Sequence, residues 1–373
     1  MKYWRGYLVA AILAAITWAA TAFAKAHTAL LDMIYPYMSR MILNSLADWS
    51  SGASFCLWQV ILIILIAFAV VSIVLMLILK WNPIQLTGWL LTGVTALSMC
   101  HVFVYGLNEH AGSLADDIRL EVTSFSVSEL NEATVYFRDK ANNLAGQIAR
   151  NRDGEPEFSD FSTLAIQAGD GFKSLTYEEA ISVFSGSTAP VKELGWKGLY
   201  AASGTYSKTM PLTGEAAVNP DIPDVALPFV MCKEMSRRMT IVGEEDARFA
   251  AYLACTANAS IEFQYSAYCI AYYYCYSALA DIPTSTAKAC AKKTDAGVSK
   301  LLRNDLQIYE DFFGEYTVTV SEEKSTAAEL LTCWYIQNFI TPLQVEEEVP
   351  FDPEDPNQVD LEGIVNAEAI GNA

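Results

Sequence analysis

Three long apolar stretches near the N-terminus dominate the pattern of hydrophobic and polar positions. They cover residues 7–24, 55–79 and 84–107, and each is long enough to cross a hydrocarbon core of about 30 Å as a helix. The first stretch follows a short basic start and ends in an Ala-Phe-Ala run, a pattern that is also typical of a cleavable signal peptide. The sequence therefore predicts a membrane anchor over residues 1–107 with three spans, and leaves open whether the first is removed.

Basic residues at the ends of these stretches predict an orientation in the bilayer. Lys2 and Arg5 precede the first stretch, and the turn at 80–83 begins with a lysine. Basic flanks favour the cytoplasmic side of a membrane. We therefore expect a multi-pass protein of the cell membrane whose residues 25–54 and 108–373 lie outside the cytoplasm.

Two features of the anchor predict how its helices lie and pack. Residues 30–46 have apolar positions at helical spacing around Pro36, which indicates an interfacial helix or, alternatively, a loop helix that packs on the outer domain. In the third stretch small residues recur every four positions, which permits close packing against another helix in lipid. These small residues are Gly88, Thr92, Ala96 and Cys100.

Beyond the anchor the pattern predicts a mainly helical domain over residues 108–345. A capping box at Ser126 and Glu129 precedes an apolar stripe at helical spacing. A second capping box, at 176–179, predicts the start of another helix. Later stripes at helical spacing follow in the last third of the domain.

Three other segments of the chain have a different pattern. Residues 204–220 combine Gly, Pro and β-forming residues and are expected to be extended. The tyrosine-rich segment 260–280 fits a core helix whose hydroxyls find partners better than a fourth membrane span. Residues 346–373 carry many acidic residues, and we expect a flexible tail there.

The charge of the chain excludes one class of partner. The formal net charge is −19, and the first 107 residues hold five Lys and Arg against two Asp. The remainder therefore holds 41 acidic against 19 basic residues. Such a surface repels phosphate backbones, so nucleic acid is not an expected partner.

Three runs of residues carry a resemblance to a known family. They are Pro211-x-Thr213-Gly214-Glu215-Ala216-x-Val218-Asn219, Leu227-Pro228-Phe229 and Glu244-x-x-Ala247-x-Phe249-x-Ala251-Tyr252-Leu253-Ala254. In these runs the chain resembles the bacterial family called domain of unknown function 3810. The resemblance implies a membrane-anchored, zincin-like α domain with a small β part, outside the cytoplasm. Its site would be a helical HExxH motif that binds Zn²⁺ together with a later glutamate.

The chain departs from that motif at the metal ligands. Through the resemblance, Lys233-Glu234-Met235-Ser236-Arg237 occupies the HExxH positions, and Glu244 occupies the third-ligand position. Making Lys a ligand at neutral pH costs roughly 4 to 5 kcal/mol, and Arg does not deprotonate. The chain's three His lie in or next to the anchor. We therefore expect no bound zinc or other cofactor, and Glu234 would be a vestigial catalytic base.

A sharper hypothesis gives the substituted residues a role. Lys233 and Arg237 would pair with Glu234 and Glu244 and replace the metal with positive charge. The nearby acidic and basic positions of the same motif are Asp246 and Arg248. The plain alternative is an ordinary helix with solvated charges and no inherited site.

The predicted function is binding without catalysis, to an extracytoplasmic peptide or a membrane partner in addition to the lipid bilayer. The predicted peptide edge lies in the extended stretch, because strands beside a zincin cleft can pair with an extended chain. Its residues are Thr213, Gly214, Glu215, Val218 and Asn219.

Two other classes of function stay open at this point. An active metallopeptidase would need atypical ligands, since thiolates and carboxylates can also bind metals. The candidates are Cys232, Cys255, Glu234, Glu244 and Asp246. The second class is a structural component of a membrane complex. Six of the eight cysteines lie beyond the anchor, where disulfides and free buried thiols are equally compatible with the sequence.

Overall fold

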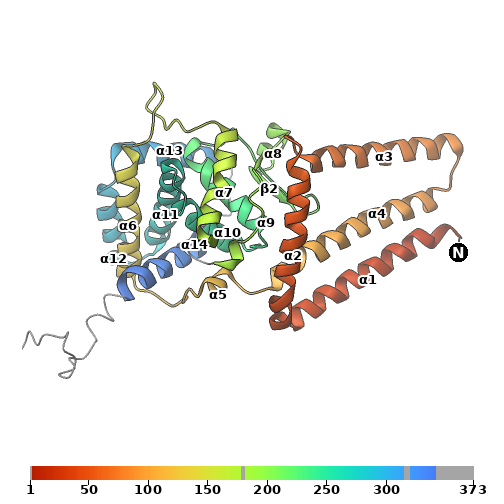
Figure 1. Ribbon diagram of the computed structural model, residues 1–373, viewed down its shortest axis with the longest axis horizontal. Coiled ribbons are helices and arrows are strands. Elements are labelled where there is room, and N and C mark those ends of the chain that lie inside the picture. Colours follow the sequence, from red (N-terminus) through yellow and green to blue (C-terminus); the bar gives the residue numbers. More distant parts are fainter. Residues whose placement is uncertain (1, 178–180, 315–319, 342–373) are drawn as a thin grey trace, which may run out of the picture.

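The protein consists of a set of long apolar helices and a mostly helical domain, joined by one crossing helix (Figure 1). The computed structural model describes residues 2–177, 181–314 and 320–341. The predicted acidic tail at 346–373 lies outside the described residues. The expectation of a mainly α fold with apolar helices at the N-terminus is confirmed.

Three described helices are long and apolar enough to cross a membrane, and they match the predicted spans within a few residues. They are α1 (Arg5–Ala26), α3 (Leu57–Leu79) and α4 (Pro83–Val104). The turn between α3 and α4 is tight because the side chain of Asn82 accepts hydrogen bonds from the amides of Ile84 and Gln85. Pro83 at the first helical position completes the cap.

The small-residue stripe of α4 packs on α1 at its first two members. A Cβ on Gly6 would lie 2.4 Å from the carbonyl carbon of Gly88, so the two backbones are in direct contact. The Thr92 hydroxyl donates to the Gly6 carbonyl at 2.8 Å. Cys100, the last member of the stripe, is exposed. Close packing is therefore confirmed for one end of the stripe, whereas α3 diverges from α4 beyond their shared turn (Figure 1).

The segment predicted as an interfacial or loop helix is the helix α2 (Thr28–Ser51). It crosses the ends of α1, α3 and α4, with the domain on its other side (Figure 1). Its inward face is buried, most completely at Leu43 and Ala47. The domain and the apolar helices are thus both packed against one element.

Helices from distant parts of the chain build the core of the domain. The aromatic-rich α11 (Ile261–Asp281) is buried against α6 (Val127–Ala145), α10 (Glu244–Thr256) and α14 (Val320–Tyr335), as expected for a core helix. The remaining helices of the domain are α5 (Leu114–Ile118), α7 (Phe161–Tyr177), α8 (Lys197–Ala202), α9 (Leu227–Arg238), α12 (Ser285–Ala296) and α13 (Lys300–Gly314). All eight cysteines lie in described parts of the chain and are free thiols.

One predicted helix start is confirmed and one is wrong. Ser126 and Glu129 form the expected reciprocal capping box of α6. Residues 176 and 177, in contrast, are the last residues of α7, and 178–180 lie outside the described residues. The helix begins earlier because the Asp160 carboxylate accepts hydrogen bonds from Ser162 and from the backbone and side chain of Thr163. These bonds lower the pKa of Asp160 to about 2.

The expected extended stretch forms two strands of a small sheet. The strands β2 (Ser207–Met210) and β3 (Glu215–Val218) are antiparallel, and β1 (Lys192–Glu193) pairs parallel to the other side of β3. The β2–β3 turn requires a glycine, because Gly214 has φ +65° and a Cβ there would lie 2.4 Å from the Ala47 amide nitrogen of α2. The sheet therefore touches the crossing helix directly.

A buried ion pair fastens the sheet to the end of α2 and the start of α3. The Lys192 ammonium donates to the Glu215 carboxylate at 2.7 Å and also to the Ser50 carbonyl of α2 at 2.7 Å. The other contacts of Glu215 are with the start of α3, where it accepts from the amides of Leu57 at 2.7 Å and Trp58 at 2.9 Å. A cation at a helix C-terminus and an anion at a helix N-terminus both suit the helix dipole.

Removing the charge of Glu215 tests this joint. We expect Glu215→Gln to lower the free energy of unfolding by about 3 to 5 kcal/mol, because it leaves the buried Lys192 ammonium without its counter-charge. The matched control is Asp221→Asn, which breaks the exposed pair with Lys197 and should cost less than about 1 kcal/mol. Chemical unfolding of the full chain in one detergent measures both, and equal losses would contradict the assigned role.

Candidate functional site

The helix that contains the predicted motif residues 233–237 is packed in the middle of the domain. The helix α9 starts with Pro228 near its first turn and is buried along most of its length. It packs on α10, which begins at Glu244 with three acidic residues in its first turn, where the helix dipole favours negative charge. Lys233 and Arg237 are four residues apart on α9 and therefore project from the same face.

The Glu244 carboxylate is surrounded by three cations. The Lys233 ammonium lies 3.0 Å from one of its oxygens and the Arg248 guanidinium 3.2 Å from the same oxygen, while Arg237 donates to the other. Burial alone would raise the pKa of Glu244, but the three positive charges outweigh it and lower the pKa to about 2. Glu244 is therefore a permanently charged anchor for these cations at neutral pH.

Glu234, which the sequence predicts as a vestigial catalytic base, is fully buried and points toward β2. One of its carboxylate oxygens accepts from the Ser207 hydroxyl and the other from the Thr209 hydroxyl, each at 2.7 Å. The Lys233 ammonium lies 3.8 Å from the first oxygen. The four residues of the sharper hypothesis therefore lie together, with the ammonium of Lys233 between the two carboxylates.

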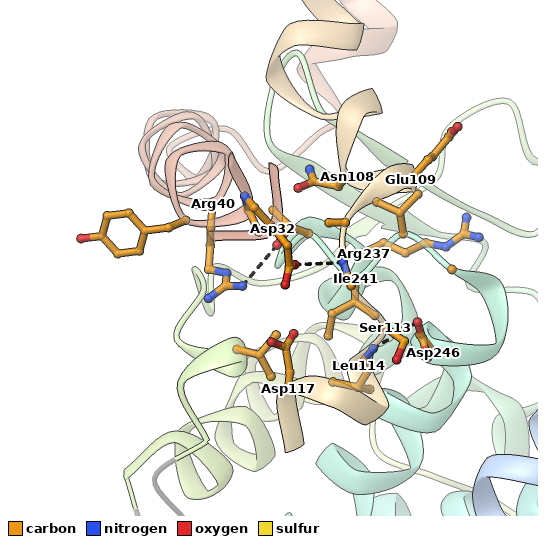
Figure 2. Close-up of a pocket in the computed structure, with 18 of the residues that line it drawn as sticks. Asp32, Arg40, Asn108, Glu109, Ser113, Leu114, Asp117, Arg237, Ile241 and Asp246 are labelled. Atoms are coloured by element: carbon orange, nitrogen blue, oxygen red, sulfur yellow. Dashed lines mark hydrogen bonds between the residues drawn. The ribbon is translucent and has the colours of Figure 1, made fainter. Parts of the chain in front are cut away.

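A polar cavity of about 630 Å³ opens beside this cluster. Arg237 and Glu244 form part of its wall, together with residues of α2, α5 and the connection between α4 and α5. Figure 2 shows Asp32 and Arg40 of α2 facing Asp117 of α5 across it. Three separate parts of the chain thus meet around one polar space next to the substituted motif.

Arg40, a cation of the cavity wall, is hydrogen-bonded to backbone carbonyls, whereas two acidic side chains of the same wall have no hydrogen-bond donor among the described residues. The Arg40 guanidinium donates to the carbonyls of Met239 and Ser182, each at 3.1 Å. Within the described residues, Asp117 and Glu109 accept no hydrogen bond. Burial raises the pKa of Asp117 above its usual range, and the charge of Asp32 raises it further, which Arg40 opposes. A positive charge placed in the cavity would be stabilised by these carboxylates.

The neighbouring motif residues have structural partners. The Asp246 carboxylate accepts from the amide of Leu114 at the start of α5, and burial raises its pKa. Arg248 contacts Glu244 and also lies over the ring of Tyr274, 5.5 Å from its centroid. Both residues therefore help to fix the walls of the site.

The residues predicted as a peptide edge do not form one. Glu215 and Val218 belong to β3, which is the central strand and is paired on both sides, so its backbone groups are already used. Thr213 and Gly214 lie in the turn against α2, and Asn219 is buried after the strand. The edge strands are β1 and β2, and β2 belongs to the predicted extended stretch. The motif residues of this run join the sheet to α2 and α3.

The alternative metal ligands do not converge on one point, although the Cys232 and Cys255 thiols interact with each other. The Cys232 thiol points to the Ala168 carbonyl and the Cys255 thiol to the Pro228 carbonyl, both inside the core. The three candidate carboxylates face β2, the cation cluster and α5, as described above. Among the described residues, no three His, Cys, Asp or Glu side chains gather in a way that could hold a metal ion.

Five residues of α2 and of the segment after α4 line or approach the site and were not predicted from the sequence. These are Asp32 and Arg40 of α2, and Tyr105, Asn108 and Glu109 after α4. Burial raises the pKa of Tyr105, with the charge of Arg237 opposing, which places its ring near the cluster. The available signal was the presence of two charged residues within the otherwise apolar segment 30–46.

Comparison with known proteins identifies the family. A family model described as "Protein of unknown function (DUF3810)" matches residues 32–327, which is most of the chain. The chain belongs to this family. The match includes most of α2, all of α3 and α4, and most of the described domain. No curated protein and no solved structure gives a significant match.

The depressed pKa of Glu244 predicts a pH dependence of stability. Its shift from 4.5 to about 2 corresponds to about 3 kcal/mol, which is fully present above pH 4.5 and is lost as the pH falls toward 2. Glu244→Gln should therefore be less stable than the parent protein at pH 6, and the difference should vanish near pH 2. Thermal unfolding of the full chain across this range measures it.

The neighbouring Glu245 provides the control for this measurement. Its side chain is exposed, so Glu245→Gln should give a small difference that changes little with pH. A Glu244→Gln difference that is equally flat would contradict the assigned ion pairs.

Proposed function

We propose that this protein is a membrane-anchored, zincin-like protein outside the cytoplasm that has lost metallopeptidase activity and acts by binding. The proposed ligand is an extracytoplasmic peptide or a membrane partner, and the proposed binding site is the cavity beside α9 and α10. The observation that carries the proposal is the cluster of Lys233, Arg237 and Arg248 around Glu244. Positive side chains stand where the family resemblance places a metal and its ligands.

The chemistry of the cluster supports a site without hydrolysis. A peptidase zinc polarises the scissile carbonyl and lowers the pKa of its bound water to about 7. Ammonium and guanidinium groups supply positive charge and hydrogen bonds but cannot bind that water as a Lewis acid. Glu234 also has a hydroxyl donor on each carboxylate oxygen, from Ser207 and Thr209. A general base needs a free oxygen toward its water.

The carboxylate of Asp117 supports a ligand with positive charge. Asp117 has no hydrogen-bond donor among the described residues and faces the cavity (Figure 2), whereas Arg40 is held by carbonyls. A peptide amino terminus or a basic side chain would supply both the charge and the donor that Asp117 lacks. The cavity volume of about 630 Å³ is large enough for a few residues of an extended peptide.

Restoring the motif histidines tests the zincin-like geometry. We expect Lys233→His combined with Arg237→His to create a zinc site, because two imidazoles four residues apart on α9 would then face Glu244. After exposure to zinc and dialysis, the purified double variant should retain about one zinc per chain. Elemental analysis of the full chain in detergent measures this.

The matched control distinguishes the effect of adding two histidine ligands from the effect of removing two positive charges. Lys233→Ala combined with Arg237→Ala removes the same charges but adds no ligand, and it should retain no zinc. A folded histidine variant that retains no more zinc than the alanine variant would contradict the zincin-like arrangement.

A further inference from the structure

The crossing helix α2 has a second face that the domain does not cover. On the side away from the buried Leu43 and Ala47, six large apolar side chains of its first two thirds are between 49% and 77% exposed. They are Leu30, Met33, Ile34, Tyr37, Met38 and Met41. A continuous apolar stripe of this length is unfavourable in water and indicates a covered surface.

The connections of α2 to α1 and α3 determine where this stripe lies along the membrane normal. α2 begins two residues after α1 ends at Ala26, and it ends six residues before α3 begins at Leu57. Both ends of α2 are therefore at the ends of helices that are long and apolar enough to cross a membrane. A helix that joins the same ends of two spans has to run along the membrane surface, as α2 does in Figure 1.

Aromatic residues mark two levels along the apolar helices. Trp4 and Trp81 are exposed at the end that contains the α3–α4 turn, and Trp49 and Phe55 are exposed at the end that meets α2. The 23 residues of α3 between these levels correspond to about 34 Å. This length matches a hydrocarbon core of about 30 Å, and aromatic side chains prefer both of its interfaces.

The short helix α8 adds a second apolar element at the same level. Trp196, the residue before α8, and Leu199 of α8 are exposed and line an apolar groove with α3, including Ile63. The loop before α8 is fixed to α3, because the Gln59 side chain and the Gly195 backbone exchange two hydrogen bonds, at 3.0 and 3.1 Å. Trp196 has φ +53°, a conformation that is strained for a bulky residue and that holds its indole at this position.

From these observations we infer that α2 and α8 form a lipid-contacting base, with the stripe of α2 and the side chains of Trp196 and Leu199 set into the interfacial layer of the bilayer. The occupant is lipid because α2 packs on the ends of α1 and α4, whose apolar side chains are mostly exposed within the described structure. The inward face of the same helix holds the domain through Arg40 and Asn44. The domain therefore lies on the membrane surface.

Site-directed fluorescence tests this inference on the full chain in lipid nanodiscs. A Cys100→Ser background removes the exposed native thiol, and single cysteines at Met33, Met41 or Leu199 carry an environment-sensitive fluorophore. Their side chains are exposed, so the substitutions remove little packing. Phe68→Cys on α3 is the reference within the span, because Phe68 is exposed and does not line the groove beside Leu199, and Lys292→Cys on α12 is the aqueous reference at the far end of the domain (Figure 1).

The quenchers are a phospholipid with a nitroxide near its headgroup and iodide in water. We expect the labels on α2 and α8 to lose most of their fluorescence to the lipid quencher and little to iodide, with the opposite result at Lys292. Quenching by iodide alone would show a water-exposed face and overturn the inference. Protection from both quenchers would show that protein covers the face and would also overturn it.

Discussion

The buried contact between Lys192 and Glu215 is the constraint on which the arrangement of this protein depends. In this one place, the end of α2, the start of α3 and two strands of the domain share hydrogen bonds. Taking two opposite charges out of water is costly, and the cost is offset here because each charge also meets the end of a helix with suitable polarity. The domain and the apolar helices are consequently one fixed body and not two units on a linker.

The β2–β3 hairpin connects this buried ion pair to the candidate site. Its turn at Gly214 lies against α2 and its second strand contacts α3, while Ser207 and Thr209 of its first strand bind Glu234 of α9. The position of α9 then determines where Lys233 and Arg237 meet Glu244 of α10. The same crossing helix also forms a wall of the cavity through Asp32 and Arg40. Membrane attachment and the site are therefore built from the same few elements.

The sequence was most informative where a local pattern determines the structure. The long apolar stretches and the α6 capping box each depend on neighbouring residues, and both were predicted. The capping box at 176–179 failed because an earlier cap at Asp160 starts a helix that still includes residues 176 and 177. A local signal cannot show that a competing helix already includes its residues.

For the site, the sequence predicted which residues of α9 share a face, but it did not predict the contacts that distant parts of the chain make with them. Four-residue spacing was enough to place Lys233 and Arg237 on one face, and the family motif indicated Glu244. The hydroxyl partners of Glu234 come from a strand 25 or more residues earlier in the chain, and the cavity residues come from the anchor. The residues named for a peptide edge lie in or beside a central strand, because β1, a strand of two residues without any recognisable pattern, pairs with β3. Within the predicted extended stretch the edge strand is β2.

Titration of the unmodified full-length protein with zinc tests the central claim most directly. The account predicts that calorimetry at neutral pH detects no saturable binding of Zn²⁺, because the cations around Glu244 occupy the ligand positions and repel a divalent ion. Stoichiometric binding that is lost in Glu244→Gln would contradict the account and would show that this site is a metal centre.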